Sequence, residues 1–72
     1  MTHSVSNLLA ELRKHSLCES DALGAFLGLD YRQTCVTAIP GIWDHYQAFK
    51  AACLSNGVKI KGRSAYGFTY SI

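Results

Sequence analysis

The fold is decided by residues 42–72, which read IWDHYQAFKAACLSNGVKIKGRSAYGFTYSI. In the first half of this stretch, apolar residues recur at steps of four, three and four, as they do on one face of an α-helix. These residues are Ile42, Tyr46, Phe49 and Cys53. Asn56 and Gly57 follow where a helix commonly ends in a left-handed cap. The pattern therefore predicts a helix over residues 42–54 that ends before Gly57.

After Gly57 the hydrophobic period changes to two. Val58 and Ile60 alternate with lysines, and the last apolar residues also occupy every second position. These last residues are Tyr66, Phe68, Tyr70 and Ile72. A period of two is typical of strands, so residues 58–72 predict a β-hairpin that the preceding helix covers on one face.

The chain of 72 residues predicts a single small domain, residues 1–72, of the α+β class. Apolar residues make up 49% of the chain and charged residues only 17%, which argues against disorder. A domain of this size has a small core, and we expect a homodimer because a second copy would bury further apolar surface.

Charge is distributed unevenly along the chain. The net charge is only +2, but all five acidic residues lie within residues 1–44. The cations after that point are Lys50, Lys59, Lys61 and Arg63. A basic segment with aromatic residues between the cations is typical of nucleic-acid binding.

Two further helices are predicted before this segment. Ser4 can cap a helix that runs to about His15 with an apolar stripe of valine and leucines. A second, short helix begins at Ser20 or Asp21 and covers residues 22–27. Within it, Gly24 would permit another helix to approach closely, and the glycine at position 28 would turn the chain out of the helix.

Three short motifs resemble winged helix-turn-helix domains, such as the N-terminal domain of biotin ligase/repressor-type regulators. Residues 23–29, LGAFLGL, are similar to the L-G-x-x-L-G-hydrophobic segment, which in that family forms the first helix of the helix-turn-helix and its turn. Residues 57–58, Gly-Val, resemble the junction of recognition helix and wing, and residues 67–70, GFTY, resemble the G-Y-x-L ending. The resemblance covers residues 5–72 and implies a small winged helix with a C-terminal β-hairpin wing.

The chain departs from this family between the turn and the helix before the hairpin. Residues 30–41 intervene, and Pro40 cannot lie inside a helix without breaking it. In one arrangement Asp30 caps a short helix over residues 31–38. In the arrangement that we favour, residues 31–40 are an inserted loop with strand character at residues 34–39, and the longer helix is the recognition element.

The fold and charge together predict double-stranded DNA binding by a small transcriptional regulator. The hairpin would bind phosphates through a polar cluster at its tip. The other interpretation of this cluster is that its lysines merely keep an edge strand solvated. This cluster is Lys59, Lys61, Arg63 and Ser64. Base contacts would come from Gln47 and Lys50 on the helix, or from Arg32 and Gln33 after the turn.

Binding to a protein is the alternative function. The outer face of the 42–54 helix has small residues against which another backbone could pack, and Trp43 and Leu54 beside them would anchor a partner if exposed. A phage or mobile-element protein that inhibits a host factor would have these features. The simpler interpretation is that Trp43 completes the core.

Other classes of function lack support in the sequence. Asp44 and His45 are adjacent, so on a helix they point apart and cannot act as a catalytic pair, and we expect neither an enzyme nor a cofactor. His15 and Cys18 lack the second ligand pair of a zinc site. The three cysteines are odd in number and form no CxxC pair, so we expect buried free thiols in a cytoplasmic protein. No apolar run is long enough to span a membrane, so we expect no membrane contact.

Overall fold

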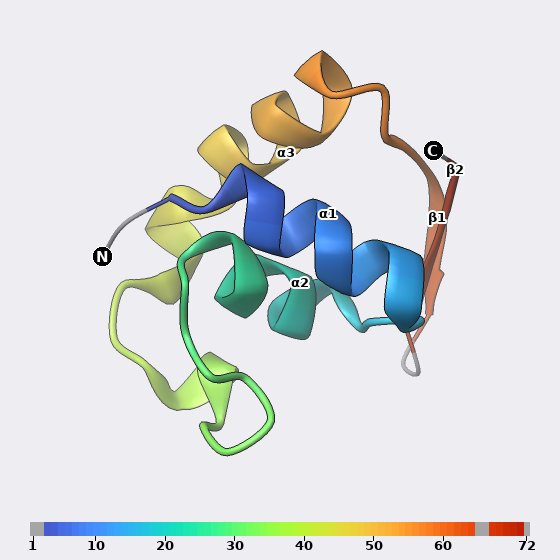
Figure 1. Cartoon of the computed structure of the whole chain (residues 1–72). Coiled ribbons are helices and arrows are strands. Elements are labelled where there is room, and N and C mark those ends of the chain that lie inside the picture. Colours follow the sequence, from blue (N-terminus) through green and yellow to red (C-terminus); the bar gives the residue numbers. More distant parts are fainter. Residues whose placement is uncertain (1–2, 65–66, 72) are drawn as a thin grey trace.

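The computed structural model describes residues 3–64 and 67–71. Three helices are followed by one antiparallel hairpin, and two short 3₁₀ helices lie between the second and third helices (Figure 1). The elements are α1 (Val5–Lys14), α2 (Glu19–Phe26), η1 (Val36–Ala38), η2 (Ile42–His45), α3 (Tyr46–Ser55), β1 (Lys59–Ser64) and β2 (Gly67–Ser71). The predicted α+β class and the order of helices before hairpin are therefore confirmed.

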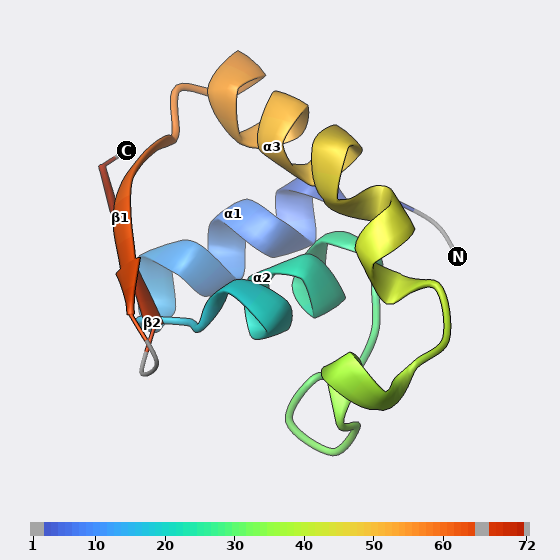
Figure 2. The ribbon, with the colours of Figure 1, turned by 180° about the vertical axis from the view of Figure 1, so that it is seen from behind.

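The first helix begins where the sequence predicts. Ser4 has an extended backbone, and its hydroxyl accepts a hydrogen bond from the backbone N–H of Asn7, which would otherwise lack an intrahelical partner. The helix ends at Lys14, one residue earlier than expected. Leu8 and Leu12 are fully buried on its inner face, where α1 packs beside α2 (Figures 1 and 2).

The second helix is the centre of the core. It starts at Glu19, after an N-cap Cys18 that makes no side-chain capping bond, and therefore earlier than predicted. Residues 22–27 are all buried, because α1, η1 and α3 all pack against this helix. Gly28 has a φ of 75° and turns the chain out of the helix, as predicted.

The connection between α2 and α3 is a loop that contains the short 3₁₀ helix η1, so the favoured prediction of an inserted loop over residues 31–40 is confirmed. Its predicted strand character at residues 34–39 is wrong, and so is the alternative of a helix over residues 31–38. Instead, a turn follows Asp30, and η1 inserts Val36 into the core. Val36 lies close to Gly24, where an added Cβ would be 2.9 Å from its Cγ2 atom. Gly24 thus permits a close approach to α2, as predicted, and the segment that approaches is the connection with its short 3₁₀ helix η1.

The predicted break at Pro40 is confirmed, and the expected helix over residues 42–54 is instead a 3₁₀ helix followed by an α-helix. Proline disfavours a helical conformation in the residue before it, and Ile39 is accordingly extended, with a ψ of 122°. The chain then makes the single 3₁₀ turn η2 before the α-helix proper begins at Tyr46. The predicted inward face is correct: Ile42, Phe49 and Cys53 are fully buried, and Tyr46 is partly buried.

A Schellman motif ends α3 and connects it to the hairpin. The N–H of Val58 donates to the carbonyl of Cys53 at 2.8 Å, and the N–H of Gly57 donates to that of Leu54 at 3.2 Å. Gly57 has a φ of 77°, which residues with a Cβ rarely adopt, so the predicted glycine stop is confirmed. Val58, the next residue, is buried in the core.

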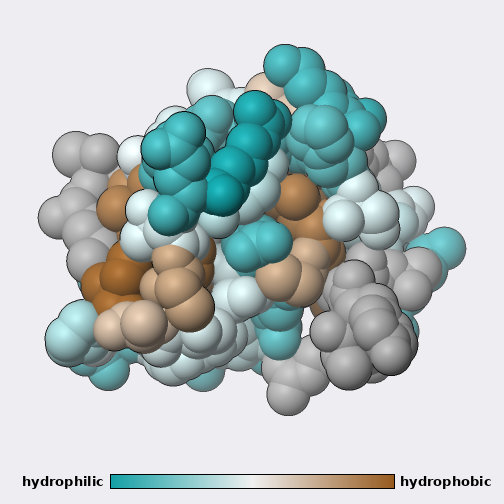
Figure 3. Space-filling model, turned by 90° about the horizontal axis from the view of Figure 1, so that it is seen from below, coloured by the Kyte–Doolittle hydropathy of each residue, from teal (hydrophilic) through white to brown (hydrophobic). Residues whose placement is uncertain are grey.

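The hairpin pairs Ile60 with Tyr70 and Arg63 with Phe68. The register shifts between Ile60 and Gly62, so Lys61 is an extra residue on β1, as in a β-bulge. The predicted strand positions 66 and 72 lie outside the described residues, as do the side chains of residues 63–69. The face of the molecule seen from below the view of Figure 1 is mixed: hydrophilic residues gather along the top of that view, and apolar patches lie at its lower left and centre (Figure 3).

Candidate nucleic-acid interface

A hollow between the end of α3 and the start of β1 brings helix and hairpin cations together. Its volume is about 340 Å³, and Lys50 from α3 and Lys59 from β1 both line it. The remaining lining is apolar and consists of Cys53, Leu54, Val58 and Ile60. The Schellman motif fixes this arrangement, because it turns the chain from α3 directly into β1.

The ammonium group of Lys50 lies over an aromatic ring as well as beside the hollow. It is 4.9 Å from the ring centroid of Tyr46, one helical turn earlier, which is a cation–π contact. Gln47 is exposed on the same helix. Both side chains therefore reach solvent from α3, as the predicted base contacts require.

The hairpin supplies further cations next to the hollow. Lys59 and Lys61 are exposed on β1. The backbones of Arg63 and Ser64 end β1 beside the turn, and their side chains lie outside the described residues. Of the predicted hairpin cluster, Lys59 is therefore the residue that the structure joins to α3.

Two large apolar side chains are exposed on α3 and η2. Trp43 is 47% exposed and Leu54 is 72% exposed. The prediction that Trp43 completes the core is wrong, because its neighbour Ile42 occupies the inward position of η2. Trp43 instead packs edge-to-face against Tyr46, with ring centroids 5.9 Å apart.

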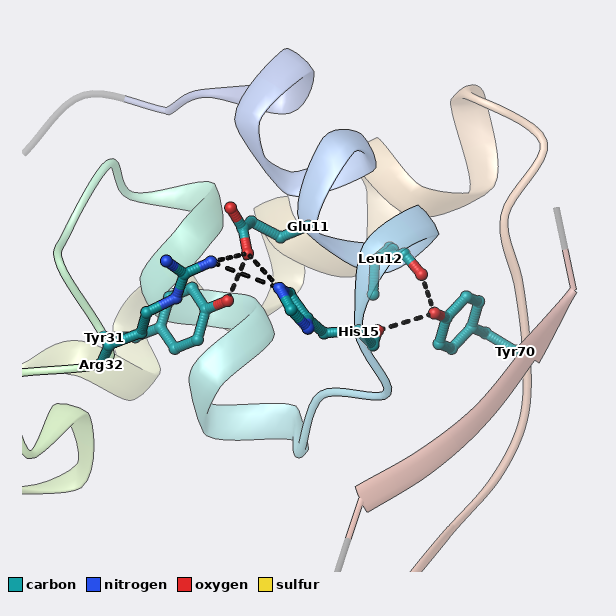
Figure 4. Close-up of polar contacts among 6 residues, drawn as sticks. All are labelled: Glu11, Leu12, His15, Tyr31, Arg32 and Tyr70. Atoms are coloured by element: carbon teal, nitrogen blue, oxygen red, sulfur yellow. Dashed lines mark hydrogen bonds and ion pairs between the residues drawn. The ribbon is translucent and has the colours of Figure 1, made fainter.

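Arg32 belongs to a different part of the molecule from Lys50. Its guanidinium donates to the carboxylate of Glu11 on α1 at 3.1 Å, and its Nη2 lies 3.3 Å from the Nε2 of His15 (Figure 4). Gln33, the other residue of the alternative base-reading pair, is exposed. The structure thus separates the Arg32 pair from the helix–hairpin hollow by engaging Arg32 with α1.

Glu11 organises the polar contacts of this region. Its carboxylate also accepts a short hydrogen bond from the hydroxyl of Tyr31, and this bond is the largest cause that lowers the pKa of Glu11 below 4.5, with Arg32 adding to it. Burial and the same hydrogen bond raise the pKa of Tyr31 above 10. Neither residue was predicted from the sequence, because a single acid and a single tyrosine 20 positions apart carry no periodic signal.

The N-terminal segment makes a contact that the sequence also did not indicate. The ring of His3 stacks on Phe26 with centroids 4.6 Å apart, and its Nε2 is 3.2 Å from the Nδ1 of His45. This contact holds the segment before α1 against the end of α2 and against η2.

The cysteines are free but differ in burial. Cys53 is buried, and burial raises its pKa. Cys18 is partly buried and Cys35 is exposed, so the prediction of buried thiols is correct only for Cys53. Among residues 3–64 and 67–71, histidine, cysteine and acidic side chains form no group of three or more that could hold a metal ion.

The described helices and hairpin define a small α+β protein with a mixed basic and apolar surface on α3 and β1. The chain matches no protein-family model, and no curated protein or solved structure matches it. Within the described part of the chain, no helix is long and apolar enough to cross a membrane.

Proposed function

We propose that this protein binds double-stranded DNA in the cytoplasm as a small transcriptional regulator. The observation that carries the proposal is the position of Lys50 on α3 and Lys59 on β1 at one hollow. A helix and a hairpin that present cations together can contact a duplex groove and its flanking backbone at the same time, as a winged helix does.

The charge of the surrounding sequence supports the proposal. Residues 45–72 contain four cations and no aspartate or glutamate, so DNA phosphates would meet no carboxylate on these elements. The nearest acidic residue in the sequence is Asp44, in η2 at the far end of α3 from the hairpin. The hairpin end of α3 and the strands after it therefore carry no acidic side chain of their own.

The roles of the residues follow from their positions. Lys61, Arg63 and Ser64 on β1 would contact phosphates, because they lie beside the turn of the hairpin. Lys50 and Gln47 would approach base edges from α3. We prefer them to Arg32 and its neighbour Gln33, because Glu11 already engages the guanidinium of Arg32. A homodimer would double these contacts and read two half-sites.

A salt titration tests the proposal directly. The anisotropy of a fluorescein-labelled 24-base-pair duplex would be measured with the wild-type chain and with Lys59→Ala, Lys61→Ala and Lys14→Ala. With about four phosphate contacts, affinity should fall roughly 100-fold between 50 and 200 mM salt. Each hairpin substitution should lower the magnitude of the salt slope by about 1. Lys14, an exposed lysine at the end of α1, is the matched control and should not change it.

The outcome that contradicts DNA binding is clear. If the duplex gives no complex at 50 mM salt, or if the affinity does not depend on salt, the proposal is wrong. Sedimentation of the same samples tests the expected homodimer, which would sediment at twice the 7.9 kDa of the chain.

A further inference from the structure

A continuous row of contacts runs along one side of η2 and α3. The ring of Trp43 packs against the ring of Tyr46, and the ammonium of Lys50 lies over the same tyrosine ring. Lys50 and Leu54 then line the hollow together. We call this row, Trp43, Tyr46, Lys50 and Leu54 with the hollow, the anchor flank. It joins the start of η2 to the start of β1 in one surface.

The apolar ends of the anchor flank are unusually exposed. Trp43 at one end and Leu54 at the other are the two large apolar side chains that the described residues leave exposed. They are eleven positions apart, which at about 1.5 Å per helical residue separates them by roughly 16 Å. Three helical turns of a partner would reach from one to the other.

Charge along the anchor flank is asymmetric. Lys50 and Lys59 stand at the hollow, whose floor is apolar. Asp44 lies at the opposite end, where it is exposed beside Trp43. Glu19 of α2 contacts the flank at Tyr46, whose hydroxyl donates a hydrogen bond to its carboxylate. An occupant that complements this surface carries an apolar side chain for the hollow, with carboxylates next to that side chain.

We propose that the anchor flank docks an acidic amphipathic helix of a partner protein. One apolar side chain of the partner enters the hollow against Leu54, a second packs on Trp43, and carboxylates near the first pair with Lys50 and Lys59. Aromatic anchors in such grooves supply most of the binding energy, while charge fixes orientation. A small carboxylic acid would fill the hollow and leave Trp43 uncovered, and a phosphate backbone offers no apolar group to either anchor.

This inference does not depend on DNA binding, and it adds a means of regulation if DNA does bind. The partner helix and the duplex would both require Lys50 and Lys59. One would therefore displace the other from the surface between α3 and β1.

The single tryptophan of the chain makes the inference testable by fluorescence. The probe is a synthetic 18-residue peptide of leucine and glutamate with its leucines on one helical face. The control peptide has the same composition in a scrambled order without such a face. The amphipathic peptide should shift Trp43 emission to the blue and protect it from acrylamide quenching, and the scrambled peptide should do neither.

Paired variants locate the binding site. Leu54→Asp puts a carboxylate at the hollow and should weaken peptide binding about 30-fold or more, the loss expected of a central anchor. Ala48→Asp makes the same charge change at an exposed position on another side of α3 and should weaken it by no more than about threefold. Circular dichroism of each variant confirms that it is folded before binding is compared.

Four results would overturn the inference. Equal binding of the two peptides would show charge attraction alone, and equal weakening by both variants would place binding elsewhere. Protection of Trp43 by the 24-base-pair duplex but not by the peptide would assign the anchor flank to DNA. Displacement of bound peptide by millimolar octanoate would assign the hollow to a small carboxylic acid.

Discussion

The hydroxyl of Tyr31 donates a hydrogen bond to the carboxylate of Glu11, and this contact joins the connection between α2 and α3 to the side of α1 (Figure 4). Within residues 28–41, Val36 is the single fully buried residue, and the other apolar residues of this segment are only partly buried against the core. A hydrogen bond to a charged acceptor is stronger than one between neutral groups. The Tyr31–Glu11 bond therefore contributes to the position of the whole connection.

Removing the Tyr31 hydroxyl should destabilise the fold in a pH-dependent way. At neutral pH, Tyr31→Phe should lower the free energy of unfolding by about 1 kcal/mol, the usual net value of one hydrogen bond. Because the bond lowers the pKa of Glu11 below 4.5, its contribution is fully present above about pH 4.5 and is lost as pH falls through the folded-state pKa. Urea melts of both proteins should therefore differ at pH 7, and the difference should shrink as the pH is lowered toward 3. An undiminished difference at pH 3 would contradict the role of the ionised carboxylate.

Arg32 and Lys61 should respond differently to substitution, although both are exposed cations. Arg32→Ala removes an ion pair with Glu11, and surface ion pairs contribute little to stability, so a small decrease in melting temperature is expected. Its salt slope for duplex binding should equal that of the wild type, whereas Lys61→Ala should reduce the slope by about 1. If Arg32→Ala reduced the slope by the same amount, Arg32 would belong to the DNA surface.

A methyl group at Gly24 should disturb the packing of the connection on α2. A Cβ at this position would lie 2.9 Å from Cγ2 of Val36 and 3.1 Å from Cβ of Tyr31. Overpacking of this kind costs about 1–3 kcal/mol, and thermal melts of Gly24→Ala should show that loss. Gly62→Ala is the matched control, because nothing lies within 4 Å of the added atom, and its melt should stay close to the wild type. Equal stability of the two variants would contradict the close approach of η1 to α2.

The hydroxyl of Tyr70 should hold the hairpin against the end of α1. It donates to the backbone carbonyls of Leu12 and His15, the latter at 3.0 Å (Figure 4). Tyr70→Phe should lower the free energy of unfolding by about 1 kcal/mol, because carbonyls at a helix C-terminus lose their donor. In the Tyr70→Phe variant, backbone hydrogen exchange should accelerate relative to the wild type, and more strongly in β1 and β2 than in α2. Lys61→Ala changes an exposed residue of the same hairpin and should alter neither the free energy of unfolding nor the exchange rates. Equal effects of the two substitutions would contradict the contact between Tyr70 and α1.

The regular elements were predictable because each has a local signal. The cap at Ser4, the 3.6-residue period of α3 and the stop at Gly57 act over a few neighbouring residues, and the structure follows all three. The N-terminus of α2 was misplaced because Cys18 gives no capping signal. The winged-helix assignment itself stays a prediction.

The loop of the connection was predicted, but its strand character at residues 34–39 was wrong, because the structure of this segment depends on distant residues. Thr34 to Ile39 contain β-branched residues that favour a strand, but no neighbouring strand is available within the described residues. Val36 instead finds its place against Gly24, and Tyr31 against Glu11, 20 residues away. Tertiary contacts therefore override local propensity in this segment.

The individual residues of the candidate site were predicted from the sequence, but which of them lie together was not. The sequence indicated Lys50 and Lys59 separately, and only the turn after α3 places them at one hollow. The helical period already placed Ile42 inward with Trp43 beside it, and Trp43 is 47% exposed, so the interpretation that Trp43 completes the core is wrong. The 3₁₀ turn η2 that holds both residues was not predicted. A change from α to 3₁₀ pitch over four residues has no signature in hydrophobic periodicity.

The joint at Gly57 and Val58 has a consequence for binding. Two backbone hydrogen bonds close the end of α3, and the buried side chain of Val58 fixes the first residue before β1 in the core. Helix and hairpin therefore leave this joint in one set direction before any ligand arrives. A ligand that contacts both elements meets a preorganised surface and forfeits little conformational entropy on binding. Lengthening the joint by a single inserted glycine should thus weaken any ligand that spans Lys50 and Lys59, even though every contacting side chain is retained.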